Sequence, residues 1–181
     1  AVFGELYWRL TDTLKLTVGL RYTEDEKSRV YYPVTLLQPV GAGGVVGAPG
    51  WNESSIVAEK IESNDTTGRV TLDWKVTDDS LLYLTLGRGY KAGGFNTPTT
   101  QGSSPPYDAE KVDAIEIGTK NIFLDGRVVL NATAFMYDYQ DYQFSKLDGF
   151  ASLVDNLDAD VRGVEIEAVW SPIDALRLNA Q

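Results

Sequence analysis

A run of glycines and cations, GRGYKAGGFN at residues 87–96, contains residue types that bind phosphate groups. Gly87 and Gly89 loosely match the G-x-G of dinucleotide-binding loops, in which glycines let the backbone approach a phosphate. That fingerprint requires a strand leading into a helix, whereas here a predicted strand leads into a segment rich in Pro and Ser. We therefore interpret these glycines as points of close backbone approach and turning.

Carboxylates are the other residues that could do chemistry, because the chain has no Cys and no His. Thiolate nucleophiles, imidazole bases and the usual zinc sites are therefore excluded. Glu165 and Glu167 share one face of a predicted strand, but nothing else in the sequence builds a hydrolytic site around them. Asp155, Asp158 and Asp160 lack the spacing of a calcium-binding loop. We predict no catalytic residue, no metal site and no cofactor.

Alternating apolar and polar residues run through most of the chain. In residues 14–23, Leu, Val and Tyr side chains alternate with Lys, Thr, Gly and Arg, which is typical of a strand with one apolar and one polar face. No helical period appears. Eight segments follow this pattern to different degrees: residues 2–10, 14–23, 67–76, 82–87, 115–120, 128–139, 164–170 and 176–181. The pattern predicts an all-β fold of about eight antiparallel strands.

Short and long connections between these segments strictly alternate. The short ones are residues 11–13, 77–80, 123–126 and 171–174, and the long ones run from Asp25 to Asp65, from Lys91 to Glu110 and from Tyr139 to Asp158. In an up-and-down meander, all short turns then lie at one end and all long loops at the other. This asymmetry is typical of an outer-membrane β-barrel, with short periplasmic turns and long extracellular loops.

The sequence predicts that the chain crosses a membrane with β-strands rather than with helices. No run of about 18 apolar residues predicts a transmembrane helix, but a barrel strand spans the bilayer with about 9 to 11 alternating residues. Trp8, Tyr22, Trp74 and Trp170 lie near strand ends on the apolar face, as in an aromatic girdle. A soluble β-sandwich also has alternating strands, but it rarely needs strands this long. The net charge of −10 disfavours a nucleic-acid partner.

Four phrases occur in order in the second half of the chain. GRGYKAGGFN follows a strand, and a strand with Glu116, Gly118 and Lys120 comes next. A strand ending in Tyr and Asp over residues 137–141 follows, and then RGVEIE at residues 162–167. From about residue 81 onward, this arrangement resembles the barrel of TonB-dependent outer-membrane receptors, which have a similar "GYK-GGFN" phrase. Residues 1–76 resemble it only at the level of pattern.

The resemblance implies that residues 1–181 are a partial barrel domain without the family's plug, drawn from a barrel of twenty-two strands. It implies uptake of a scarce nutrient across the outer membrane, most commonly a ferric siderophore, with energy supplied by TonB through the plug. Outer-membrane lipid and lipopolysaccharide are the other implied partners. A small structural or adhesive barrel without transport, and a soluble β-sandwich binding module, are the alternative interpretations.

Two sets of residues are candidates for a functional site. Rim and loop residues that could contact ligand are Tyr31, Tyr32, Trp51, Arg88, Tyr90, Lys91, Tyr107, Tyr139 and Tyr142. Charges expected to face the lumen are Arg9, Arg21, Arg69, Asp73, Lys75, Glu116, Lys120, Glu165 and Glu167. Packing within loops is the alternative role for each aromatic residue, and Arg88 and Lys91 could equally meet lipopolysaccharide phosphates. Hydrogen bonding across the wall is the main role expected of the lumenal charges.

Overall fold

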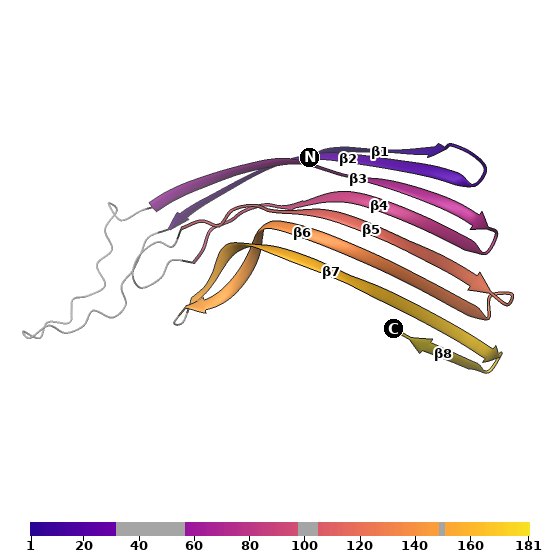
Figure 1. Cartoon of the computed structure of the whole chain (residues 1–181). Coiled ribbons are helices and arrows are strands. Elements are labelled where there is room, and N and C mark those ends of the chain that lie inside the picture. Colours follow the sequence, from indigo (N-terminus) through magenta and orange to yellow (C-terminus); the bar gives the residue numbers. More distant parts are fainter. Residues whose placement is uncertain (32–56, 98–104, 149–150) are drawn as a thin grey trace, which may run out of the picture.

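The computed structural model describes residues 1–31, 57–97, 105–148 and 151–181. These residues form a single curved sheet of eight antiparallel strands in which each strand pairs with its neighbours in sequence (Figure 1). The strands are β1 (Val2–Arg9), β2 (Leu14–Tyr31), β3 (Val57–Thr77), β4 (Ser80–Lys91), β5 (Glu110–Phe123), β6 (Val128–Asp148), β7 (Ala151–Ile173) and β8 (Leu176–Ala180). The expected all-β, up-and-down fold is confirmed. The sheet is open, with β1 and β8 at its edges.

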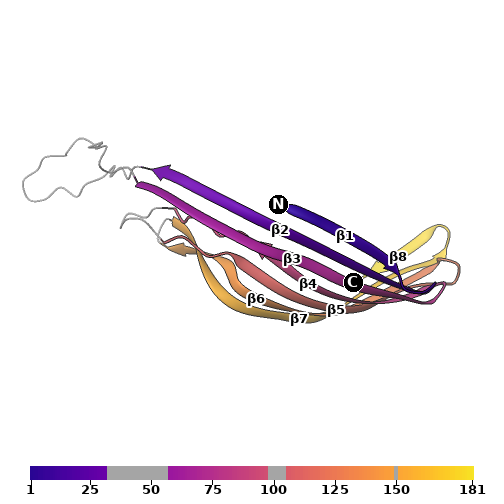
Figure 2. The same cartoon turned by 90° about the horizontal axis from the view of Figure 1, so that it is seen from above.

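The two ends of the sheet differ as expected. The four short connections lie together at one end, which we call the turn end (Figures 1 and 2). The opposite ends of the strands, where β2 meets β3, β4 leads towards β5 and β6 meets β7, form what we call the outer end. The β5–β6 turn contains three successive residues in the left-handed region, Leu124, Asp125 and Gly126, with φ of 54°, 54° and 86°. No helix in the described ranges is long and apolar enough to cross a membrane.

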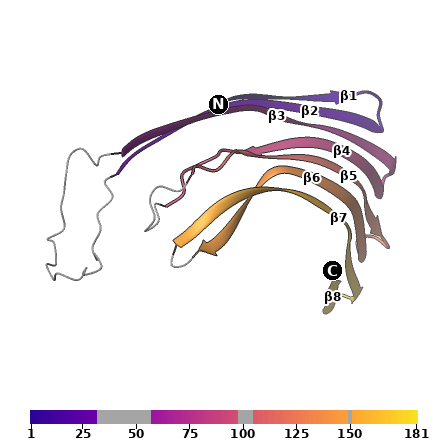
Figure 3. The ribbon, with the colours of Figure 1, turned by 60° about the vertical axis from the view of Figure 1, so that its left-hand side comes forward.

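The strands are longer at the outer end than the sequence pattern predicts. β2 continues to Tyr31 and pairs with β3 from Val57 onward, and the β6–β7 ladder reaches from Asp148 to Ala151. Residues 23–31 and 57–65 thus form a two-stranded arm, because the ladder between β3 and β4 stops at Gly68 (Figure 3). The expected loop boundaries were wrong here. Charged residues occupy both faces of the arm, so the period-two signal disappears although backbone pairing continues.

Strand register separates two faces, which we call the apolar and polar faces. Leu16, Leu72 and Leu84 lie opposite one another on the apolar face, and Thr17, Thr71 and Thr85 do so on the polar face. The apolar face is uncovered: Leu20 is 61% exposed and Ile117 is 59% exposed. Leu153 is the one buried hydrophobic residue among those described. A soluble sandwich buries such a face against a second sheet, whereas a barrel wall turns it towards lipid.

Glycines allow side chains and backbone to lie directly on the sheet at two places. A Cβ at Gly118 would lie 2.5 Å from the ring of Tyr83, so this ring covers the glycine. At the outer end, Gly94 forms an isolated antiparallel bridge with Tyr107. A Cβ at Gly93 would lie 2.5 Å from the carbonyl oxygen of Tyr107. In contrast, a Cβ at Gly87 would meet nothing closer than 3.8 Å.

Arginine substitutions should distinguish the two faces. Leu72→Arg puts a cation on the apolar face, which costs a barrel strand about 2 to 4 kcal/mol near the bilayer midplane. Thr71→Arg, one residue away on the polar face, should cost clearly less. Urea unfolding of the membrane-inserted protein, followed by tryptophan fluorescence, measures both costs. Equal losses would show that the assignment of faces is wrong.

Alanine substitutions should distinguish two of the four glycines of the 87–96 segment, Gly93 and Gly87. Gly93→Ala forces a Cβ against the backbone of Tyr107, so we expect a loss of about 1 to 3 kcal/mol in local stability. Hydrogen exchange at the amide of Tyr107, which donates to the Gly94 carbonyl at 2.9 Å, reports this loss. Gly87→Ala is the matched control and should leave that exchange rate unchanged. A similar rate in both variants would contradict the close approach.

Candidate ligand-facing surfaces

Ion pairs connect neighbouring strands across the polar face of β1, β2 and β3. The guanidinium of Arg69 donates two hydrogen bonds to one Glu5 carboxylate oxygen, at 2.6 and 2.9 Å. Tyr7 donates to the other oxygen of Glu5 at 2.5 Å. Towards the turn end, Lys15 and Asp73 form a second cross-strand pair at 2.7 Å. Each pair joins residues on adjacent or next-adjacent strands, so it stabilises the wall from one side.

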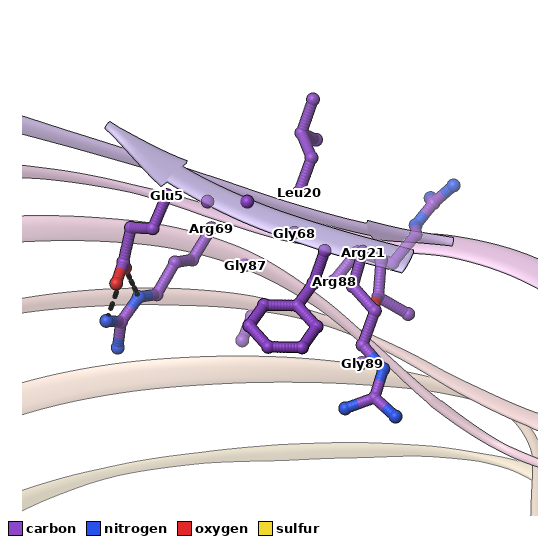
Figure 4. A pocket seen from close by; sticks show the side chains of 13 residues that line it. Glu5, Leu20, Arg21, Gly68, Arg69, Gly87, Arg88 and Gly89 are labelled. Atoms are coloured by element: carbon purple, nitrogen blue, oxygen red, sulfur yellow. Dashed lines mark hydrogen bonds and ion pairs between the residues drawn. The ribbon is translucent and has the colours of Figure 1, made fainter. Parts of the chain in front are cut away.

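A shallow groove of about 490 Å³ lies beside the Glu5–Arg69 pair (Figure 4). Gly19 and Gly87 contribute to its polar-face lining: the side chains of Glu5 and Arg69 lie over Gly19, whereas Gly87 leaves the backbone uncovered. Figure 4 shows Leu20 pointing to the opposite side of the sheet from Glu5 and Arg69. The groove therefore combines bare backbone with an ion pair, and it can accept a closely packed polar segment.

The polar face of β4 to β7 is held by hydrogen bonds over glycine. The hydroxyls of Tyr83 and Thr133 share a hydrogen bond of 2.7 Å across Gly118, and the Lys120 ammonium lies 5.7 Å from the centre of the Tyr83 ring. Tyr137 donates to Glu116 at 2.5 Å. The Tyr83–Thr133 contact passes over β5 and so constrains the curvature of the sheet, whereas the other two contacts join adjacent strands.

All nine charges that were expected to face the lumen lie on the polar face by register: Arg9, Arg21, Arg69, Asp73, Lys75, Glu116, Lys120, Glu165 and Glu167. Several of these charged side chains form hydrogen bonds with neighbouring residues. Arg21 donates to Thr23 at 3.1 Å, and Glu167 accepts from the Asn131 amide at 3.0 Å. Lys75 bonds to Asp78 in the β3–β4 turn at 2.6 Å and lowers the pKa of that carboxyl. Glu5, to which no role was assigned from the sequence, is the partner of Arg69.

Arg88 lies on the apolar face rather than among the polar-face charges. It makes a bidentate pair with Asp113 on the neighbouring strand, at 2.6 and 2.5 Å. Leu86 and Ile115 occupy the next row towards the turn end, so the pair marks the outer border of the apolar band. The signal for Asp113 was present in the sequence, because it shares the period-two face of Ile115.

Lys91 and Tyr90 follow Arg88 at the end of β4. The Lys91 side chain is 62% exposed and lies 3.9 Å from Glu110. Tyr90 is half-buried and lies opposite Lys111, whose ammonium contacts Asp65 at 2.5 Å. That contact ties the end of β5 to the arm. Of these two candidates, Lys91 presents its charge to solvent.

The aromatic candidates at the outer end differ in what their rings contact. The Tyr31 ring lies 4.8 Å from the Arg29 guanidinium, and the Tyr107 ring lies on Gly94. Tyr139 and Tyr142 form an edge-to-face pair with centroids 5.3 Å apart. Tyr31 belongs to β2, and Tyr139 and Tyr142 belong to β6, so all three lie in strands rather than in the expected loops. Tyr32 and Trp51 lie outside the described residues.

A β-bulge separates the two tyrosines of this pair. The ladder between β6 and β7 shifts register between Tyr139 and Tyr142, and Asp141 has a φ of 55°. The Asp141 amide donates to Asp158 at 3.2 Å, and its carbonyl accepts from the Asn156 amide at 2.7 Å. Bulges re-aim side chains, and here the bulge sets the edge-to-face geometry of the pair. In the described parts of the chain, no group of three or more acidic residues is placed to hold a metal ion.

Comparison with known proteins supports the architecture. The family model described as TonB dependent receptor-like, beta-barrel matches residues 1–181. Pesticin receptors from Yersinia enterocolitica and Yersinia pestis are 31% and 30% identical over 172 residues, which is 94% of this chain and 23% of theirs. The chain thus spans about a quarter of the length of these relatives.

Solved structures show the same fold. The ferric yersiniabactin uptake receptor FyuA from Yersinia pestis is 28% identical, with a TM-score of 0.69 over 95% of this chain and 24% of its own. The copper transporter OprC has a TM-score of 0.69 at 18% identity and shows the fold alone. These relatives are receptors and transporters rather than enzymes, in agreement with the absence of predicted catalytic residues. The chain belongs to the TonB-dependent receptor β-barrel family, whose members lie in the outer membrane of Gram-negative bacteria.

Proposed function

We propose that these residues supply part of the wall and outer rim of a receptor that imports a ferric siderophore with energy from TonB. The observation that carries this proposal is the similarity, over nearly the whole chain, to pesticin receptors and to the ferric yersiniabactin uptake receptor. The chain covers about a quarter of these proteins, and each edge strand of its sheet, β1 and β8, pairs with a neighbour on one side only. Both facts support a partial barrel domain that adjoins further strands and a plug.

The two faces of the sheet suit this role. The uncovered apolar face provides a lipid-facing band, and the polar face provides a hydrated wall lined with paired charges. Ion pairs such as Glu5–Arg69 can exchange partners with a plug at little cost, because water screens the attraction between exposed charges. We propose that the groove beside this pair receives a segment of the plug.

We propose that the tyrosine pair of β6 and the cation at the end of β4 contact the ligand. Tyr142 is 40% exposed, and Lys91 is 62% exposed at its side chain. Aromatic rings and a cation can bind an anionic ferric chelate through stacking and charge. Tyr31 and Tyr107 are weaker candidates, since their rings already contact Arg29 and Gly94.

We assign Arg88 to the outer lipid border. It lies on the apolar face, and its pair with Asp113 neutralises both charges at the edge of the apolar band. Phosphates of lipopolysaccharide can compete with Asp113 for this guanidinium through bidentate hydrogen bonds. This contact would hold the wall at the correct depth in the membrane.

Growth of a deletion strain tests the proposed function. A strain that lacks the receptor is supplied with iron only as one ferric siderophore at a time, including ferric yersiniabactin. We expect the loss of growth on at least one of these iron sources and its restoration by the gene in the presence of TonB. Growth of the deletion strain on every siderophore would contradict uptake and would favour a structural or adhesive barrel.

Removing the Tyr142 ring from the tyrosine pair should weaken uptake without unfolding the barrel. Tyr142→Ala removes an aromatic contact, so we expect the apparent KM for the growth-supporting ferric siderophore to rise about tenfold, or about 1.4 kcal/mol. Tyr22→Leu, on the apolar face, is the control and should leave KM unchanged. Uptake of radioactive iron measures both values. An unchanged KM in the Tyr142 variant would remove this residue from the ligand site.

A further inference from the structure

The last residue of the GGFN phrase is a buried side chain at the outer end. Asn96 is 5% exposed, and its amide nitrogen donates to the carbonyls of Pro105 and Val154, at 3.0 and 2.8 Å. Its amide oxygen accepts from the backbone N–H of Val154 at 2.6 Å. The side chain therefore bonds to β7 in both directions, as a neighbouring strand would. It also joins the two sides of the β4–β5 connection.

The same residue holds the β2–β3 arm through its backbone. Arg29 on the arm donates through Nη1 to the Asn96 carbonyl and through Nε to Glu59 at 2.5 Å. The Arg29 guanidinium lies between the rings of Tyr31 and Phe95, with its carbon 4.8 and 4.6 Å from their centroids. The arm is thus attached to residues 92–97 by charge-assisted and cation–π contacts.

Further hydrogen bonds connect the arm, β6 and β7 to the residues on either side of the β4–β5 connection. Lys27 donates to the Gly93 carbonyl at 2.6 Å, which gives the arm a second contact. Gln143 on β6 donates to the carbonyls of Ala92 and Asp108, at 3.0 and 3.1 Å. Asn156 on β7 accepts from the Asp108 amide at 2.7 Å. The arm and the outer parts of β6 and β7 therefore all bond to residues 92–97 and 105–108.

We propose that Asn96 is a positioning residue that locks the arm, residues 92–97 and 105–108, and the outer part of β7 into one rigid unit. Asn is suited to this position because its short amide carries both a donor and an acceptor. Asp has the same shape but loses the donor and places a negative charge against two carbonyl oxygens. Loss of the amide also removes the hydrogen bonds that the half-buried Val154 carbonyl and the Pro105 carbonyl accept from Asn96.

The lock determines how the outer surface moves. The Asn156 that binds Asp108 also holds the bulge beside Tyr142, so the tyrosine pair belongs to the locked unit. A preorganised surface binds its ligand without the entropy cost of ordering loops. This consequence rests on the proposed function, whereas the lock itself does not.

Distances between spin labels test the lock in the complete receptor in lipid, without any ligand. Labels are attached to cysteines introduced at three exposed positions of the locked unit: Ser28 on the arm, Thr97 after the GGFN phrase and Ser152 on β7. Pulsed electron resonance gives the width of the distance distribution for the pairs 28–152 and 97–152. These 181 residues contain no cysteine, which simplifies labelling.

Two variants and one control separate the lock from general folding. Asn96→Asp should at least double both widths, whereas Arg29→Met should widen only the pair 28–152, because it releases the arm alone. Asn121→Asp is the matched control: near the turn end, its amide nitrogen donates to the Leu130 carbonyl at 2.9 Å and its amide oxygen accepts from the Thr119 hydroxyl at 3.2 Å. It should change neither width. Heat-dependent migration on gels checks that each barrel is folded.

Unchanged widths in Asn96→Asp would overturn the proposal. Should that variant fail to fold, Arg29→Met decides: a wider 28–152 distribution alone supports the lock, and two unchanged distributions overturn it. The result is distinguishable from failure of the proposed function. A receptor that imports no ferric siderophore but shows the expected widening would contradict the uptake proposal and retain the lock.

Discussion

Backbone hydrogen bonding between sequential strands is the interaction on which the rest of this structure depends. With Leu153 as the one buried hydrophobic residue among those described, side-chain packing within the sheet cannot be its main support. The ladders from β1 to β8 satisfy the backbone, and this allows the sheet to present different faces to two different surroundings. Everything that the side chains do follows from the register of these ladders.

The strand register aligns the alternating apolar and polar residues of neighbouring strands into one apolar and one polar face. On one side it aligns Leu16, Leu72 and Leu84 into a band for lipid, and on the other it brings Arg69 to Glu5 and Tyr83 to Thr133. Beyond the apolar band, the sheet no longer has one apolar and one polar face. Charges occupy both faces of the arm, and its polar side chains bond to residues 92–97 instead.

The sequence predicted the parts of this structure that depend on period and turn chemistry. Eight strands, their two faces and the short turns at one end could be derived, because the apolar residues share one face of the sheet and each short turn has turn-forming residues. The extensions of β2, β3, β6 and β7 could not, since paired strands with solvent on both sides show no alternation. Residues of the outer lock were missed for another reason. Asn96 bonds to Val154, which is 58 residues away, and no local pattern indicates such a partner.

The central claim is that the chain forms a barrel wall with its apolar face in lipid and its polar face in water. Spin labels placed singly at residues 69–75 of β3, in the reconstituted receptor, test it by collision with oxygen and with a water-soluble nickel chelate. We expect high oxygen accessibility at the even-numbered positions, on the side of Leu72, and low accessibility at the odd-numbered positions, on the side of Thr71. Uniform accessibility along β3, or alternation in the opposite phase, would contradict this account.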